Sequence, residues 1–308
     1  MKNAKFIFGP VPSRRLGRSL GISPIPKKTC NYSCIFCQLG RTDRMTNTRK
    51  EFFPVADILA ELDEYLKSSN EFDVISLVGE GEPTLYLKLG ELLKGIKERT
   101  DKPVAVITNG ALLSDESVRK ELMEADIVLP SLDSVSSAMY HQIDRPYGTI
   151  DYDEVTHGLE LFSHEFKGQI FIEVMLMDKL NDDEESLQKF REILSHVRYD
   201  KVYINTPVRP PAESYAGISS PEAIKRAVEL LDGISIDALA AGTFGSETAD
   251  DYEAILEIIG RHPMNQFEIG GFLDSRSNPE PEKIIKRLQD DPEVISTEYK
   301  GYFTYRLK

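Results

Sequence analysis

One pattern limits the possible folds of this chain more than any other: between residues 19 and 206, short apolar runs alternate with longer amphipathic segments. In the longer segments apolar residues recur at helical spacing, as Val55, Ile58, Leu62 and Leu66 do. We expect helices at residues 55–66, 87–99, 114–125, 152–166 and 183–197. We expect strands at residues 74–78, 104–108, 126–132, 169–177 and 201–205, with a first strand just before Cys30. Such alternation predicts an α/β fold of parallel βα units, which can curl into a partial (βα)6 TIM-like barrel.

The pattern changes near residue 212, so we expect two domains. Residues 1–212 would form the barrel-like core together with an N-terminal loop rich in arginine. Residues 213–308 would form a small α+β module, with helices at 221–231, 249–261 and 281–290. The last stretch, 293–307, alternates on both sides of Lys300 and Gly301, which is typical of a β-hairpin. Helices followed by a hairpin predict a winged-helix-like module.

The charge balance restricts the partners that the chain can bind. It carries 51 acidic and 37 basic residues, a formal net charge of −14, and residues 215–308 are also more acidic than basic. A broad nucleic-acid-binding surface is therefore not expected. No apolar run approaches the ~18 residues of a membrane span, and residues 1–8 do not form a secretory signal. Clustered thiols that stay reduced predict a cytoplasmic protein.

The chemistry of the chain is concentrated in its three cysteines, Cys30, Cys34 and Cys37, which all lie in one eight-residue stretch. The C-x3-C-x2-C spacing can hold three irons of an iron–sulfur cluster and leave the fourth iron free for an exchangeable ligand. A zinc site or chance clustering is the alternative interpretation. Structural zinc requires four ligands, and the first histidine of the chain is His141, far from the cysteines in the sequence.

The cysteine motif, with Phe36 before its last cysteine, resembles that of the radical S-adenosylmethionine (radical SAM) enzymes. The resemblance implies a [4Fe–4S] cluster on Cys30, Cys34 and Cys37 and a bound S-adenosylmethionine that chelates the open iron. It implies that S-adenosylmethionine is cleaved reductively to methionine and a 5′-deoxyadenosyl radical. This radical removes hydrogen from a substrate. It also implies a low-potential electron donor of the ferredoxin or flavodoxin type. Phe36 would belong to the cofactor pocket.

Further cofactor contacts are expected where the strands end, because ligands of parallel βα folds gather at that edge. The segment Gly79-Glu80-Gly81-Glu82 resembles the Gly-Gly-Glu segment of the family, whose carboxylate holds the methionine ammonium. Here Glu80 separates the glycines, and we favour Glu82 as the ligand group, with Glu80 directed away from the ligand. An ordinary glycine-rich turn is the alternative for this segment.

Three later strand ends add candidates for the same cofactor pocket. Asn109 follows the third strand, and Ser131 and Asp133 resemble the positions that reach the ribose hydroxyls in the family. Glu173 interrupts an apolar strand, where a carboxylate is costly unless it is paired. It either faces the cofactor or meets an arginine or lysine inside the barrel, and the sequence does not decide between the two.

Four arginines could bind a substrate anion. Arg14, Arg15 and Arg18 lie in a Pro/Gly-rich segment upstream of the cysteines, and Arg209 follows the sixth strand. A guanidinium binds carboxylate or phosphate with two hydrogen bonds. The first three could also contact an acidic electron donor or the protein's own acidic surface, and Arg209 could be a solvated loop residue. No catalytic residue can be assigned on the substrate side.

The N-terminal segment and the residues after Cys37 resemble a narrower radical SAM group, related to the archaeal enzyme of wybutosine synthesis on transfer RNA. That enzyme carries a second cluster on additional cysteines, which this chain lacks. The resemblance implies an unidentified substrate, which could be a macromolecule such as transfer RNA or a protein. The alternative of another class is a non-catalytic sensor that uses its metal site for regulation.

Overall fold

The computed structural model describes residues 5–67, 71–78, 80–236, 244–246 and 248–308. Its largest element is an eight-stranded sheet of order β1-β2-β5-β6-β7-β8-β9-β10. The strands are β1(Ile7–Ser13), β2(Gly17–Ile22), β5(Val74–Leu77), β6(Val104–Thr108), β7(Ile127–Pro130), β8(Gln169–Met175), β9(Lys201–Asn205) and β10(Ile234–Ser235). All neighbours pair in parallel except β1 and β2, which form an antiparallel hairpin. The six expected strands are confirmed as β2 and β5 to β9.

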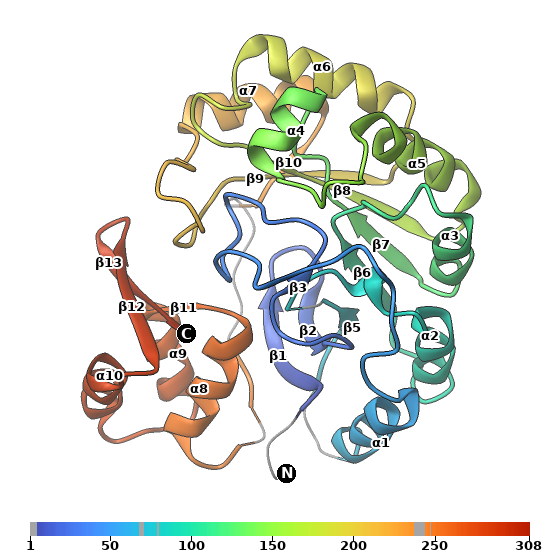
Figure 1. Ribbon diagram of the computed structural model, residues 1–308. Coiled ribbons are helices and arrows are strands. Elements are labelled where there is room, and N and C mark those ends of the chain that lie inside the picture. Colours follow the sequence, from blue (N-terminus) through green and yellow to red (C-terminus); the bar gives the residue numbers. More distant parts are fainter. Residues whose placement is uncertain (1–4, 68–70, 79, 237–243, 247) are drawn as a thin grey trace.

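Helices cover the outer face of this sheet and form an arc around it (Figure 1). They are α1(Val55–Tyr65), α2(Leu89–Lys97), α3(Glu116–Leu122), α5(Tyr152–Glu165), α6(Glu184–Ser195) and α7(Pro221–Leu231). A short helix, α4(Ser137–Ile143), precedes α5, and η1(Pro83–Leu85) follows β5. The strands are buried on both faces, as parallel strands are. Ile75 and Ile172 belong to the core shared with the helices, whereas Val74 and Phe171 belong to a smaller inner core.

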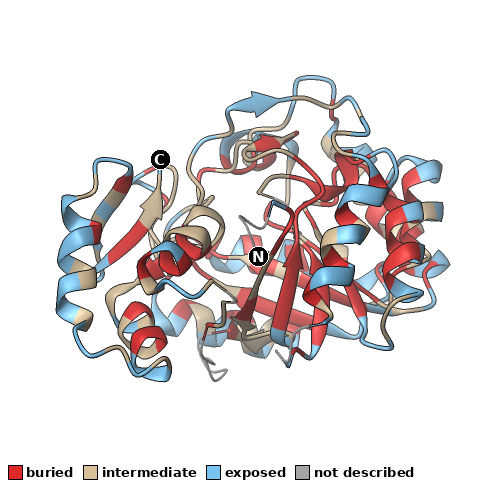
Figure 2. Ribbon diagram, turned by 90° about the horizontal axis from the view of Figure 1, so that it is seen from below, coloured by how far each residue is buried: buried red, intermediate tan, exposed pale blue. Residues whose placement is uncertain are grey.

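Burial follows the same layers. Figure 2 shows buried residues concentrated in the strands and exposed residues on the outward faces of the helices. A partial barrel with helices outside and a small inner core confirms the expected α/β, TIM-like class. The hairpin partner β1 was not expected, because its Pro/Gly-rich sequence predicts a loop.

The C-terminal residues form a separate small core beside β1 (Figure 1). Their elements are α8(Asp251–Arg261), β11(Met264–Asn265), α9(Gln266–Ser275), α10(Pro281–Asp290), β12(Val294–Tyr299) and β13(Tyr302–Leu307). The expected hairpin is confirmed, with Lys300 and Gly301 both at positive φ in its turn. Helix α9 was not expected. We call residues 244–308 the C-terminal unit, and the winged-helix description of it stays a prediction.

Helix α7 packs differently from the expectation that the second domain begins at residue 213. Its Ala227 and Leu231 are buried in the core shared by the sheet and the outer helices, and the helix contacts α6 and β9. The C-terminal core instead contains Val11 of β1. The division of the chain after residue 212 stays a prediction. No helix within the described parts of the chain has the length and apolar character needed to cross a bilayer.

Candidate active site

The three cysteines lie on a loop that crosses the carboxyl ends of the strands. The loop leaves β3(Thr29–Cys30), which pairs with β4(Arg44–Met45), and the buried Ile35 anchors its middle. The amide of Ile35 donates to the Ile143 carbonyl at 2.9 Å, and the amide of Cys37 donates to the Cys34 carbonyl at 3.2 Å. These contacts fix the loop, and its three thiols are free and half-buried.

The surroundings of the thiols fit a cluster. Burial raises the pKa of all three thiols, and the charges of Asp144 and of the other two cysteines further raise the pKa of Cys34. Binding of iron would release those protons. Among the described residues, no three His, Cys, Asp or Glu are placed to share one metal ion. In a cluster each thiolate binds a different iron, so no shared atom is required.

The Gly-Glu-Gly-Glu segment packs against the chain that leads into Cys30. The amide of Lys28 donates to the Glu80 carbonyl at 2.5 Å, and the amide of Glu82 donates to the Thr29 carbonyl at 3.1 Å. A Cβ atom at Gly81 would lie 1.8 Å from the Thr29 carbonyl oxygen, so only glycine fits there. Gly81 is thus required by the close approach of the Thr29 backbone. Gly79 lies outside the described residues.

Glu82 is buried beneath the cysteine loop. Its Oε1 accepts hydrogen bonds from the Thr84 amide at 2.9 Å and from the hydroxyls of Thr84 and Thr108 at 2.6 Å each. Its Oε2 accepts from the Asn109 amide at 2.7 Å. Burial raises the pKa of this carboxyl, and the hydrogen bonds from Asn109, Thr108 and Thr84 oppose the rise. The carboxylate joins the ends of β5 and β6.

Glu80 lines the large cavity described below, and its Oε2 lies 3.7 Å from Nε of Arg261. We had expected Glu82 to face the ligand and Glu80 to point away from it. Which of the two glutamates contacts the methionine ammonium stays a prediction.

Of the other residues expected to contact the cofactor, Asn109 lies against the cysteine loop, whereas Ser131 and Asp133 lie near β8. The side-chain amide of Asn109 donates to Asn31 at 2.7 Å and lies 3.7 Å from the Cys30 sulfur, so it supports the cysteine loop. Ser131 is half-buried beside Glu173, with which its backbone forms a bridge. Asp133 is buried, and its carboxylate accepts from the Met175 amide at 2.8 Å. Among the residues described, neither Ser131 nor Asp133 lines the cavity, so an open ribose-binding position for Asp133 is not seen.

A cavity of about 370 Å³ lies between the cysteine loop, the strand ends and the C-terminal unit. Small-molecule sites occupy about 300–1,000 Å³, so the volume suits a ligand. Cys34, Phe36 and Cys37 contribute to its lining. Polar side chains from distant parts of the chain also line it, among them Arg15, Glu173, Asn205, Arg209, Arg261 and His262.

The structure shows the paired alternative for Glu173, and its contact with the cofactor stays a prediction. It lines the cavity, and it forms an ion pair with Arg15. The side-chain amide of Asn205 donates to it at 2.9 Å. The pair explains how a carboxylate is tolerated in the apolar strand β8.

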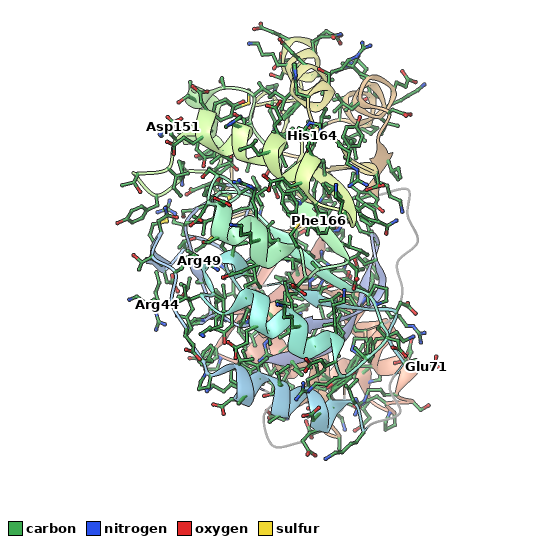
Figure 3. The ribbon with its side chains drawn as sticks, turned by 90° about the vertical axis from the view of Figure 1, so that its right-hand side faces the viewer. Arg44, Arg49, Glu71, Asp151, His164 and Phe166 are labelled. Carbon is green, nitrogen blue, oxygen red and sulfur yellow. The ribbon has the colours of Figure 1, made fainter. Side chains whose placement is uncertain are left out.

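The four candidate arginines do not all lie at the same site. Arg14, Arg15 and Arg209 line the cavity. Arg18 instead lies on the outside, where it donates to Asp73 and to Glu71 at 3.0 Å. Glu71 is at the edge of the molecule in Figure 3, on the opposite side from Arg44 of the segment that follows the cysteine loop. Arg18 is therefore not part of the cavity, because side chains alternate along β2 and it is Ser19 and Gly21 that line the cavity.

Sequence reasoning missed the residues that the C-terminal unit contributes: Arg261, His262 and Glu268 line the cavity. They lie where α8 ends and α9 begins, and no motif marks them in the sequence. Asp144 was also missed. It lies beside Cys34, accepts from the Ser134 hydroxyl at 2.6 Å, and burial raises its pKa together with that of the neighbouring Asp133.

Comparisons with known proteins agree with the barrel-like fold and the cysteine loop. Residues 25–190 match the profile described as the radical SAM superfamily. A UPF0026 protein of Methanocaldococcus jannaschii is 35% identical over 97% of this chain and 94% of its own length. A protein of Brachyspira hyodysenteriae named GTPase Obg is 34% identical over 98% of this chain, which spans 45% of that protein.

Among solved structures, a radical SAM methyltransferase from Sphaerobacter thermophilus matches with a TM-score of 0.51 and 18% identity. The match covers 72% of this chain and 69% of that protein. At this identity the likeness concerns the fold alone, and the fold it shares is the barrel-like core.

Proposed function

Because this chain belongs to the radical SAM superfamily, and to the UPF0026 proteins within it, we propose that it is an enzyme that removes hydrogen from a substrate bound beside its cysteine loop. The cofactors of the superfamily are a [4Fe–4S] cluster and S-adenosylmethionine. The observation that carries the proposal is the position of Cys34 and Cys37 on the wall of a ligand-sized cavity at the strand ends.

The chain's own residues would hold and enclose these cofactors. Cys30, Cys34 and Cys37 would bind three irons, and Asn109 would keep Cys30 in place through the contact with its sulfur. The methionine ammonium would be held by Glu80, which lines the cavity, or by Glu82, which lies beneath the cysteine loop. When bound, the cofactors supply a 5′-deoxyadenosyl radical that takes a hydrogen atom from the substrate.

Two finer statements belong to this proposal. The chain would receive its electron from a low-potential donor of the ferredoxin or flavodoxin type. If the expected relation to the wybutosine-synthesis enzyme holds, the substrate chemistry of this chain would still differ, because its three cysteines suffice for one cluster only. A non-catalytic sensor is less well supported, since a sensor does not need a polar, ligand-sized cavity beside its metal site.

The test is anaerobic reconstitution followed by reduction in the presence of S-adenosylmethionine. The protein should release 5′-deoxyadenosine and methionine slowly, even without its substrate. The Cys34→Ala variant should release neither, because no other cysteine can replace the lost ligand. Equal release by this variant would contradict the site assignment, and no release by the native protein would contradict the proposed function.

A further inference from the structure

The C-terminal unit is fastened to the barrel at the cavity itself. Arg209, in the loop after β9, donates from Nε to the Pro263 carbonyl at 2.8 Å and from Nη2 to Glu268 at 3.0 Å. Arg261, at the end of α8, donates to the carbonyls of Ile7 and Lys5. The unit therefore contributes to the wall of the cavity. It lies next to the hairpin of β1 and β2 (Figure 1).

Basic side chains from three separate segments meet at this wall. Arg15 belongs to the turn between β1 and β2, Arg209 to the loop after β9, and His262 directly follows α8. Burial and the charge of Arg209 lower the pKa of Arg15 to about 10. Burial, with the charges of Arg209 and Arg15, lowers the pKa of His262 well below its usual value. The two cations thus line one cavity together with a neutral imidazole, within electrostatic reach of one another, and all three side chains are partly exposed.

The carboxylates nearby use only part of the hydrogen-bonding capacity of these cations. A guanidinium has five N–H donors arranged as a fork. The ion pair with Glu173 involves Nη1 of Arg15, and the contacts of Arg209 involve Nε and Nη2. In the part of the chain that the structure describes, donors of both side chains are therefore left to face a ligand. A neutral imidazole adds one more N–H donor.

We infer that the substrate carries an oxyanion group, a phosphate or a carboxylate, that binds between Arg15, Arg209 and His262. This inference rests on the proposed function and names the class of its substrate. An anion there accepts hydrogen bonds from the donors of both guanidiniums that Glu173 and Glu268 leave unused, in the manner that makes arginine the usual oxyanion ligand. The rest of the substrate then lies toward Cys34, Phe36 and Cys37, on the same cavity.

The same arrangement assigns a role to the C-terminal unit. It contributes His262 to the anion site and, through Glu268 and the Pro263 carbonyl, holds Arg209 in place. The unit would therefore be half of the substrate site. This role agrees with the acidic charge balance of that unit, which does not favour a nucleic-acid surface.

The experiment is calorimetric titration of the reconstituted full chain, saturated with S-adenosylmethionine under anaerobic conditions. Sodium phosphate and sodium malonate are the two probes, and sodium chloride of equal ionic strength is the blank. Binding of phosphate alone identifies a phosphate group, and binding of malonate alone identifies a carboxylate. Saturation with S-adenosylmethionine before titration ensures that the anion does not occupy the position of the cofactor carboxylate.

The variants are Arg209→Gln, His262→Gln and the double variant Arg15→Gln/Glu173→Gln, which removes a guanidinium without leaving its carboxylate unpaired. Arg18→Gln is the matched control, because Arg18 follows the same turn but pairs with Glu71 and Asp73 outside the cavity. We expect at least tenfold weaker anion binding in the double variant and in Arg209→Gln, and native binding in the control. If Arg209→Gln does not fold, anion binding by the double variant and by His262→Gln is compared with that of the control instead.

Two results would overturn the inference. One is that neither anion binds above the chloride blank, and the other is that Arg18→Gln weakens binding as much as the double variant. Release of 5′-deoxyadenosine is measured in parallel on the same samples. If 5′-deoxyadenosine is released but neither anion binds, the inference is refuted and the proposed function stands. If no 5′-deoxyadenosine is released, the proposed function is refuted.

Discussion

The substitution Glu82→Gln should destabilise the protein far more than Glu80→Gln, although both remove one negative charge. Two backbone amides bind the Glu82 carboxylate, that of Thr84 on one oxygen and that of Asn109 on the other. A glutamine side chain has a single oxygen and cannot accept from both amides. In either orientation a backbone N–H then faces an NH₂ group.

The cost follows from these contacts. A buried donor left without an acceptor costs about 1–3 kcal/mol, and the remaining bonds lose the assistance of the negative charge. We therefore expect a loss of roughly 2–4 kcal/mol in the free energy of unfolding. Glu80 has no hydrogen bond of this kind from its side chain among the described residues, and its partner Arg261 lies 3.7 Å away. Its substitution should cost less than that of Glu82, because Arg261 keeps its contacts with the carbonyls of Ile7 and Lys5 and no backbone amide loses its acceptor.

The assay is urea-induced unfolding of the cluster-free proteins, followed by circular dichroism, with the native chain and both variants compared at one pH. Because Asn109 also contacts the Cys30 sulfur, the iron content after reconstitution should fall in Glu82→Gln. Equal stability of the two variants would refute the interpretation that Glu82 joins the strand ends. A larger loss in Glu80→Gln would show that the structural and the ligand-facing glutamates are the reverse of those described.

Three further predictions follow from the site. Iron and sulfide analysis of the reconstituted protein should give about four of each per chain and no more, since all three cysteines belong to one loop; a clearly higher content would contradict a single cluster. A double-mutant cycle on Arg15→Gln and Glu173→Gln should give a coupling of about 1–3 kcal/mol in the free energy of unfolding, because the two form a largely buried ion pair; additive effects would mean that the pair does not form. Burial and the charges of Arg209 and Arg15 lower the pKa of His262. Below pH ~6.5 the unfolded chain therefore binds a proton at this imidazole that the folded chain does not bind. Stability should therefore fall by up to about 1.4 kcal/mol per pH unit on acidification from pH ~6.5, and the difference between the native chain and His262→Gln should show this slope; a difference independent of pH would contradict the buried, neutral imidazole.

The fold of the core could be predicted because its signal is local. Apolar runs alternate with amphipathic helices in the order of the chain, so the periodicity around Val74 or Val104 is sufficient to place each strand. The hairpin partner β1 could not be predicted in the same way. Its residues include Gly9, Pro10 and Pro12, which indicate a loop, and it becomes a strand by pairing with β2 and packing against the C-terminal core.

The cysteine loop could be predicted for a similar reason, since its three ligands lie within eight residues. The roles of Glu80 and Glu82 could not, because their sequence neighbours are almost alike. The difference arises from Thr108 and Asn109, whose donors reach Glu82 from the neighbouring strand β6. The sequence of residues 79–82 does not indicate which donors will reach its side chains.

The substrate side of the cavity depends most on tertiary contacts. Arg15 and Arg209 are separated by most of the chain, and His262 comes from a unit whose sequence gave no sign of a role in the site. Their convergence follows from the position of the C-terminal unit beside β1. The same geometry removed Arg18 from the candidates, although in sequence it looks equivalent to Arg14 and Arg15.

The most direct test of the central claim is electron paramagnetic resonance of the reduced protein with and without S-adenosylmethionine labelled with ¹⁷O in its carboxylate and ¹⁵N in its amino group. If Cys30, Cys34 and Cys37 hold three irons and leave the fourth open, the spectrum should change on addition, and both labels should show hyperfine coupling to the cluster. An unchanged spectrum without coupling, in protein that contains its full cluster, would contradict the assignment of an open iron beside the cavity.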